Sequence, residues 1–248
     1  MRPEIVVGIF SFLIASSAIR AESPPWGAHR EDLAQEFRIP VRHDHTVRSC
    51  QGELVITGEE VAYHTTHRRH ARRWRFSDIQ LMTVASRTEL SVLTYESDRW
   101  TLGRDRTFRF RVTKGELSPE VSAFLLSRIG RPVAMALAAP WREPLYEFGA
   151  RHRHRFGGCQ GTIRIHPEGV AYVSLDHPRD SRFWRWLDIQ GIGRLGPYHF
   201  EVVTYEPEFG GPARPYVFDL KVSMSDEVYD FLWERVYGTA SRATEGSR

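Results

Sequence analysis

Residues 72–80 read RRWRFSDIQ, and residues 182–190 read RFWRWLDIQ. Matches of this kind continue in the same order over nearly the whole chain, which chance does not explain. They pair Cys50-Gln51-Gly52 with Cys159-Gln160-Gly161, Val61-Ala62-Tyr63 with Val170-Ala171-Tyr172, Thr94-Tyr95-Glu96 with Thr204-Tyr205-Glu206, and Phe124-Leu125 with Phe231-Leu232. The sequence therefore predicts two tandem copies of one structural unit.

Each unit has the pattern of several short strands followed by a helix. Apolar residues and histidines alternate with polar residues from Phe37 to Val47, and more short strands follow up to Val112. Ser118 and Ser225 are typical helix N-caps. The apolar stripes after them are Val121, Phe124, Leu125 and Ile129, and Val228, Phe231, Leu232 and Val236. We expect an all-β fold with C-terminal helices: two seven-stranded barrels, each capped by an amphipathic helix.

Seven strands and one helix resemble the pleckstrin-homology-like (PH-like) superfold, including bacterial PH-like and GRAM-type domains. The resemblance rests on Arg-x-Trp followed by Asp-Ile-Gln, at Arg72 to Gln80 and again at Arg182 to Gln190, which is similar to the middle strands of such units. It implies tandem PH-like modules with a non-enzymatic binding or scaffolding role. Trp74 and Trp184 each lie in an alternating strand and recur in both copies, so we expect both to be core residues.

The N-terminus has the features of a signal peptide. Arg2 precedes a nearly all-apolar run from Ile5 to Ile14, and small residues follow up to Ala21. We expect cleavage and export to the periplasm or the cell exterior, with a retained N-terminal anchor as the alternative. No later segment is apolar and long enough to span a membrane. The predicted segments are a signal peptide (1–21), a first PH-like unit (36–130), a linker (131–144), a second PH-like unit (145–238) and a disordered tail (239–248).

The overall charge argues against nucleic acid as a partner. The chain has 34 Lys and Arg against 31 Asp and Glu, a formal net charge of +3. One local run, residues 67–75, is strongly basic, and its counterpart at residues 177–185 is less so. The candidates for binding an anion or a partner are Arg68, Arg69, Arg73 and Arg75; the alternative is a solvated hairpin. The expected partner is another protein or an envelope surface, of unspecified identity.

The paired histidines are candidate metal ligands. His43 and His45 lie two apart on the first predicted strand, and His152 and His154 repeat the arrangement. Alternate residues share one face of a strand, and neutral imidazoles are common zinc ligands. A third ligand could come from Cys50 or His67 in the first copy, and from Cys159 or His177 in the second. The alternative is a set of inward-facing, hydrogen-bonded core histidines.

The two cysteines occupy equivalent positions in the two copies. An exported chain with an even number of cysteines permits a disulfide between Cys50 and Cys159. It would require the two positions to face each other across the interface. A small buried thiol in each copy is the simpler interpretation, and the sequence leaves both open.

Two structural ion pairs are expected, Arg72 with Asp78 and Arg182 with Asp188. Each arginine shares its strand face with a buried tryptophan and so needs an acidic partner. The alternative acids, Glu96 and Glu206, also recur.

An enzyme is the least supported class. Ser49 and Cys50 lie near His45 and Asp44, but Asp44 and His45 point to opposite faces of a regular strand, and the second copy lacks both Ser49 and Asp44. We therefore expect an exported, non-enzymatic tandem PH-like binding protein without a cofactor. The alternative is a metal-binding protein that uses the paired histidines.

Overall fold

The structure, a computed structural model, describes residues 35–45, 49–97, 105–136, 143–206 and 213–238. The predicted signal peptide and disordered tail lie outside the described residues. Within those residues, no helix combines the length and the apolar character needed to cross a membrane.

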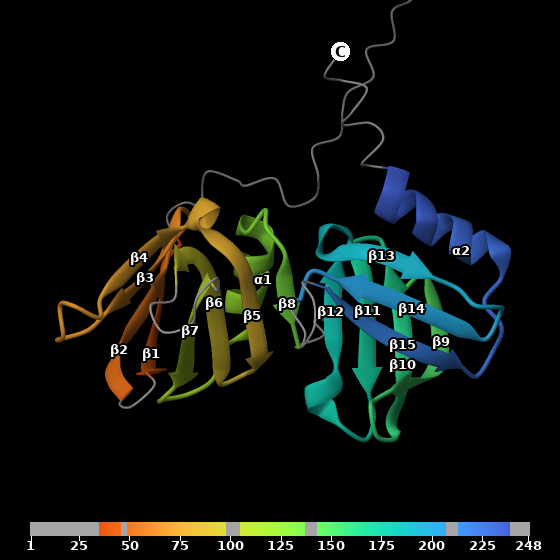
Figure 1. The fold of residues 1–248 in the computed structure, drawn as a ribbon, viewed down its shortest axis with the longest axis horizontal. Coiled ribbons are helices and arrows are strands. Elements are labelled where there is room, and N and C mark those ends of the chain that lie inside the picture. Colours follow the sequence, from red (N-terminus) through yellow and green to blue (C-terminus); the bar gives the residue numbers. More distant parts are fainter. Residues whose placement is uncertain (1–34, 46–48, 98–104, 137–142, 207–212, 239–248) are drawn as a thin grey trace, which may run out of the picture.

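Strands dominate both halves of the chain, and each half ends in a helix (Figure 1). The first repeat contains β1 (Phe37–Asp44), β2 (Ser49–Ile56), β3 (Glu60–His64), β4 (Arg72–Arg75), β5 (Ile79–Ser86), β6 (Glu89–Ser97), β7 (Asp105–Val112) and α1 (Pro119–Arg128). The second repeat contains β9 (Tyr146–Arg153), β10 (Gly158–His166), β11 (Gly169–Ser174), β12 (Arg182–Arg185), β13 (Ile189–Gly193), β14 (His199–Thr204), β15 (Arg214–Leu220) and α2 (Asp226–Trp233). A short strand between them, β8 (Val133–Met135), belongs to neither repeat.

The strands follow the same order in the two repeats. Across the sheet the first repeat runs β5-β6-β7-β1-β2-β3-β4, and the second runs β13-β14-β15-β9-β10-β11-β12. The expectation of two closed barrels is wrong, because the described strands form one open 15-stranded sheet that begins at β13 and ends at β4. Between the two repeats, β5 and β12 pair with β8 along their outer edges.

Part of the predicted linker, Val133–Met135, is therefore in the sheet. β8 pairs in parallel with β5, from Met82 opposite Val133 to Val84 opposite Met135. Its other edge meets β12 in an antiparallel pair, Phe183 opposite Met135. Figure 1 shows β8 between the two lobes, beside α1. The apolar Val133, Ala134 and Met135 are all buried there.

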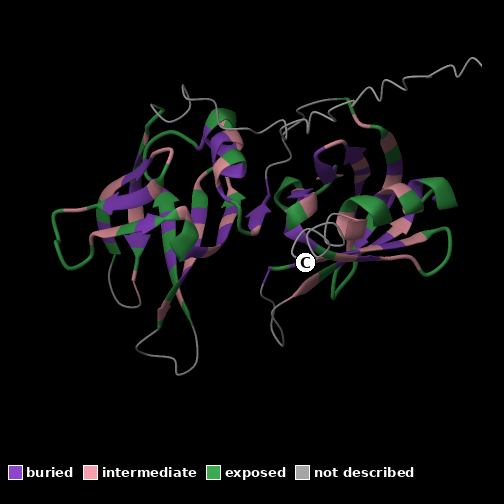
Figure 2. Cartoon of the chain, turned by 90° about the horizontal axis from the view of Figure 1, so that it is seen from above, coloured by how far each residue is buried: buried purple, intermediate pink, exposed green. Residues whose placement is uncertain are grey.

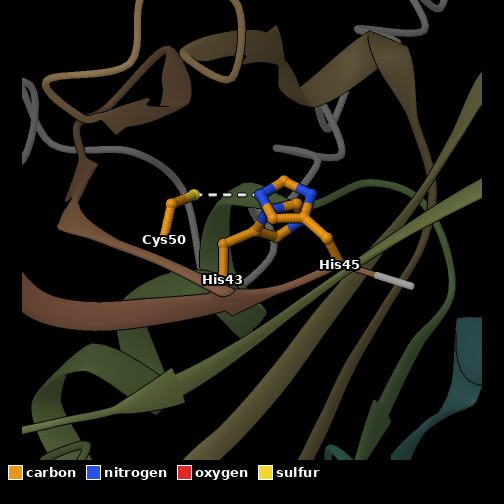
Figure 3. Close-up of side chains that lie close together, drawn as sticks. All are labelled: His43, His45 and Cys50. Carbon is orange, nitrogen blue, oxygen red and sulfur yellow. Dashed lines mark hydrogen bonds between the residues drawn. The ribbon is translucent and has the colours of Figure 1, made fainter. Parts of the chain in front are cut away.

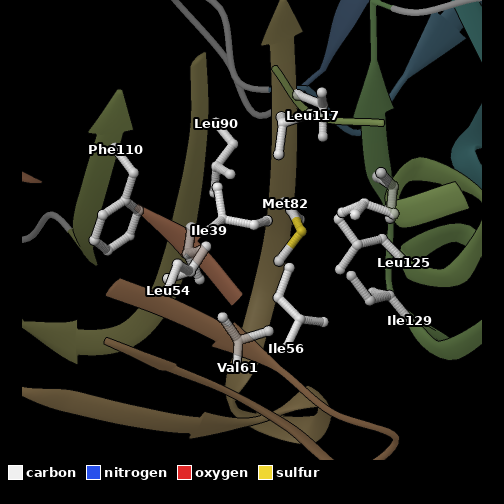
Figure 4. Close-up of a cluster of buried hydrophobic side chains, with 14 of the residues drawn as sticks. Ile39, Leu54, Ile56, Val61, Met82, Leu90, Phe110, Leu117, Leu125 and Ile129 are labelled. Carbon is white, nitrogen blue, oxygen red and sulfur yellow. The ribbon is translucent and has the colours of Figure 1, made fainter. Parts of the chain in front are cut away.

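Each repeat has its own hydrophobic core, and the first core extends across the junction. In Figure 4, Leu125 of α1 and Ile129, which follows the helix, face Met82 and Ile56 of the sheet. The same cluster includes Phe183 of the second repeat. Figure 2 shows buried residues inside both lobes and exposed residues along the loops. The core of the first repeat therefore continues past β8 onto the second repeat.

Several predictions about side chains are confirmed. Trp74 and Trp184 are 3% and 1% exposed. The Ser118 hydroxyl accepts a hydrogen bond from the Val121 amide, and the Ser225 hydroxyl accepts one from the Val228 amide, as expected of N-caps. The stripe of α1 is buried throughout, whereas in α2 only Val228 and Leu232 are fully buried.

A buried ion pair fastens the second repeat to the first. Arg185 lies beside Asp188 with 2.7 Å between Nη2 and Oδ1, and the two side chains are 5% and 1% exposed. The Arg185 guanidinium also donates to the carbonyls of Leu126 and Ile129 at the end of α1. Asp188 accepts from the Val133 amide of β8 at 2.8 Å. These bonds satisfy helix-end carbonyls and a strand amide that have no partner of their own.

Candidate functional site

The first hairpin of each repeat brings histidine and cysteine together. In the register of β1 and β2, His43 lies opposite Cys50; in β9 and β10, His152 lies opposite Cys159. Directly paired residues of an antiparallel ladder point to the same face, here toward the interior. His45 follows the end of β1, and its ring returns to within 4.2 Å of the His43 ring, centroid to centroid.

In the first repeat, three potential ligand atoms converge (Figure 3). The distance from His43 Nδ1 to His45 Nε2 is 3.2 Å, and that from His45 Nε2 to Cys50 Sγ is 3.0 Å. A single ring nitrogen is thus in contact with two other polar atoms, although a neutral imidazole nitrogen is either a donor or an acceptor and not both.

The second repeat has the same cluster. His154 Nε2 lies 3.2 Å from Cys159 Sγ, and His152 Nδ1 lies 3.8 Å from it. In each cluster the three ligand atoms lie within 4.8 Å of one another. We call these the first site (His43, His45, Cys50) and the second site (His152, His154, Cys159).

A tyrosine supports each cysteine, and a glycine makes room for it. The Tyr63 hydroxyl lies 3.1 Å from Cys50 Sγ and donates to the Cys50 carbonyl at 3.0 Å. A Cβ at Gly52 would lie 2.7 Å from the Tyr63 ring and 2.2 Å from the His64 carbonyl oxygen. Tyr172 and Gly161 repeat this around Cys159. The repeated Cys-Gln-Gly sequence therefore has a structural reason, since only glycine lets the ring reach the thiol.

Aromatic rings enclose the inner histidine of each site. The His43 ring packs against Tyr63, Phe108 and Phe110. Burial, with smaller effects from His45 and Arg106, lowers the pKa of His43 to about 4. Burial, followed by the nearby His154, lowers the pKa of His152 to about 4. Both imidazoles are therefore neutral at pH 7, the form that binds a metal ion.

The donor set suits a transition metal ion. Metal–nitrogen bonds of about 2.0–2.1 Å and metal–sulfur bonds of about 2.3 Å place neighbouring ligands of a trigonal or tetrahedral centre about 3.3–3.8 Å apart. The distances along both clusters, 3.0 to 3.8 Å, are close to this range. Imidazole and thiolate favour zinc, copper and similar ions over magnesium or calcium.

The structure shows which residue can be the third ligand of each site. Cys50 and Cys159 complete the two clusters, whereas His67 and His177 are exposed and belong to neither. Both cysteines are free and buried. Asp44 pairs with Arg42 at 3.0 Å on the opposite, exposed side of the strand, so it does not orient His45.

The expected ion pairs Arg72–Asp78 and Arg182–Asp188 do not form, because all four residues have other partners. The Arg72 guanidinium lies 3.7 Å from Glu96, one of the alternative acids, and donates to the carbonyls of Arg69 and Ala71. Asp78 instead accepts a hydrogen bond from the Arg75 amide.

In the second repeat Asp188 pairs with Arg185 three residues earlier. Arg182 donates to the Tyr216 hydroxyl at 3.2 Å, and that hydroxyl donates to Glu206 at 2.8 Å. Each aspartate comes at the end of a single turn after its strand, so it folds back onto the residue that starts the turn rather than onto the more distant arginine.

The basic candidates lie on the outer edge of the first repeat. Arg68, Arg69, Arg73 and Arg75 are all exposed. Arg73 forms a surface ion pair with Glu60 at 3.2 Å. Anion or partner binding by this group stays a prediction.

Comparison with known proteins shows no family. No protein-family model matches the chain, and no curated protein matches it. One similar solved structure is the crystal structure of the C-terminal domain of an unknown protein from Leishmania infantum, at 14% identity and a TM-score of 0.27, covering 38% of this chain and 82% of that chain. Another is the structure of the Spt16D Pob3N heterodimer, at 9% identity and a TM-score of 0.29, covering 68% of this chain and 81% of that chain. The resemblance to PH-like domains therefore stays a prediction.

Proposed function

We propose that this protein binds transition metal ions, one at the first site and one at the second site. The observation that carries the proposal is the recurrence of two histidines and one cysteine with converging ligand atoms in both repeats. A hydrogen-bonded core would need only matched donors and acceptors, whereas three atoms meeting around one point is the arrangement a metal requires.

The support around the ligands favours this role. Each cysteine contacts a tyrosine hydroxyl, which holds the sulfur in place as outer-shell partners of metal ligands do. Each inner histidine is fixed by an aromatic enclosure. Cys50 and Cys159 are 5% and 0% exposed, which suits a ligand better than a nucleophile that must reach a substrate. The proposed activity is therefore binding and not catalysis.

We place these sites in an exported module that binds another protein or an envelope surface, following the signal-like N-terminus and the PH-like resemblance. The recurrence of one strand order and one terminal helix supports a duplicated binding module. N-terminal sequencing of material from the native cell envelope tests the export: Met1 should be absent.

The test of metal binding is the metal content of the purified full-length protein after loading with Zn²⁺ and removal of unbound ion. Two ions per chain are expected. Cys50→Ser and Cys159→Ser should each retain one, and the double variant none. His64→Ala, which changes an exposed histidine outside both sites, should retain two.

Loading with Co²⁺ gives an independent readout, because a thiolate ligand produces a charge-transfer absorption band. That band should fall by half in each cysteine variant. If a cysteine variant fails to fold, His45→Ala changes a partly exposed ligand and serves in its place. Wild-type protein that retains no metal, or cysteine variants with unchanged content, would refute the proposal.

A further inference from the structure

The turn before β4 and the turn before β12 each present a further ligand-type residue at the same position. In the first repeat the amide of His70 donates to the His67 carbonyl at 2.7 Å. In the second, the amide of Asp180 donates to the His177 carbonyl at 2.8 Å. The two turns therefore have the same backbone hydrogen bond, and His70 and Asp180 occupy equivalent places.

Both residues lie next to the outer histidine of their site. The His70 ring is 4.3 Å from the His45 ring, centroid to centroid. Asp180 Oδ2 is 3.8 Å from His154 Nε2. The side chain differs between the repeats, but both versions are metal ligands. The residues between the ends of each turn, Arg68 and Arg69 or Pro178 and Arg179, cannot bind a metal ion.

Three ligands leave one position of a tetrahedral centre open, and in each repeat the turn lies beside the outer histidine. Neighbouring nitrogen and oxygen ligands of such a centre are about 3.4 Å apart, so Asp180 needs only a small shift to bind. His70 is exposed, and rotation of its side chain can bring a ring nitrogen toward His45.

We propose that His70 is the fourth ligand of the first site and that Asp180 is the fourth ligand of the second site. This inference rests on the proposed metal-binding function. The first site then has three imidazoles and one thiolate, and the second has two imidazoles, one thiolate and one carboxylate.

The two sites consequently differ in charge. The ligands of the first site carry one negative charge as thiolate, and those of the second carry two. A divalent ion is therefore less well neutralised in the first site, and the second site should bind Zn²⁺ or Co²⁺ more tightly.

The experiment measures Co²⁺ affinity by absorption titration of the full chain with one site removed at a time. Cys159→Ser isolates the first site, and Cys50→Ser isolates the second. Adding His70→Ala or Asp180→Ala should weaken the remaining site about tenfold or more, because even an outer-shell partner typically contributes tenfold to hundredfold. His70→Asp should largely restore affinity in the first site. His67→Ala and His177→Ala, at the other end of the same turns, should leave the affinity unchanged.

The outcomes separate this inference from the proposed function. Unchanged affinity in both His70→Ala and Asp180→Ala, with Co²⁺ still bound through the cysteines, would overturn the fourth ligands and leave the three-ligand sites standing. Loss of affinity that the His67→Ala and His177→Ala controls share would also overturn them, since the turn and not the ligand would then matter. No Co²⁺ binding in either single-site background would refute the proposed function itself.

Discussion

Removing the charge of Asp188 should destabilise the protein strongly, because its partner lies at the junction of the two repeats. Arg185 contacts both carboxylate oxygens of Asp188, at 2.8 Å from Nε and 2.7 Å from Nη2. Asp188→Asn keeps the size of the side chain but leaves a buried guanidinium without its counter-charge. Breaking one partner of such a pair typically costs about 3–5 kcal/mol, a large share of the 5–15 kcal/mol that stabilises an ordinary domain.

Arg185→Met should cost at least as much. It leaves the buried carboxylate without its counter-charge, and it removes donors from the carbonyls of Leu126, Ile129 and Arg131. The double variant should cost less than the sum of the two single variants, since neither charge is then left alone.

The first repeat supplies a matched control. Arg75 and Asp78 are the equivalent residues, but both are exposed and no second lobe covers them. Arg75→Met should change the free energy of unfolding by less than about 0.5 kcal/mol. Urea unfolding of the metal-free protein at 25 °C measures all four variants. A cost for Arg185→Met no greater than that for Arg75→Met would refute the reasoning.

Three further predictions concern the cores and the sites. Phe124→Ala should lower the free energy of unfolding in urea by about 3–5 kcal/mol, because Phe124 is only 6% exposed. Phe231 is partly buried, so Phe231→Ala should lower it by less. Equal small losses in both variants would contradict this. Gly161→Ala should cost about 1–3 kcal/mol and weaken metal binding at the second site, since the new Cβ would lie 2.4 Å from the Val173 carbonyl oxygen, whereas Gly130→Ala, with nothing within 4 Å, is the neutral control. Free Zn²⁺ at about 100 times its dissociation constant should stabilise the wild type by about 2.7 kcal/mol per site, seen as a higher Tm, and this gain should vanish in the double cysteine-to-serine variant.

The sequence predicts what depends on local pattern. Period-2 alternation places His43 on the interior face, and the serines that cap α1 and α2 are recognisable by type. Self-comparison of the chain finds Cys50 with Cys159, because both copies need the same thiol beside the same tyrosine. These features are fixed within a few residues or within one hairpin.

The features that the sequence does not predict depend on contacts between distant segments. Arg75 and Arg185 share the preceding tryptophan and the aspartate three residues later, yet one is exposed and the other is buried against α1. Only the second lies where the other repeat docks, and the shared motif does not show which arginine that is. His70 and Asp180 escape self-comparison for another reason: the chemistry recurs while the amino acid changes.

Because β8 pairs with both repeats, either half of the chain would have an exposed strand edge if it were produced on its own. A fragment ending before Val133 would leave the backbone groups of β5 unpaired along one edge, and a fragment beginning after Met135 would do the same to β12. Unprotected edges of this kind are templates for pairing with other chains, and they promote aggregation. The second fragment would also open Arg185 and Asp188 to water. The duplicated halves have thus become interdependent: the segment that joins them also covers one strand edge in each half.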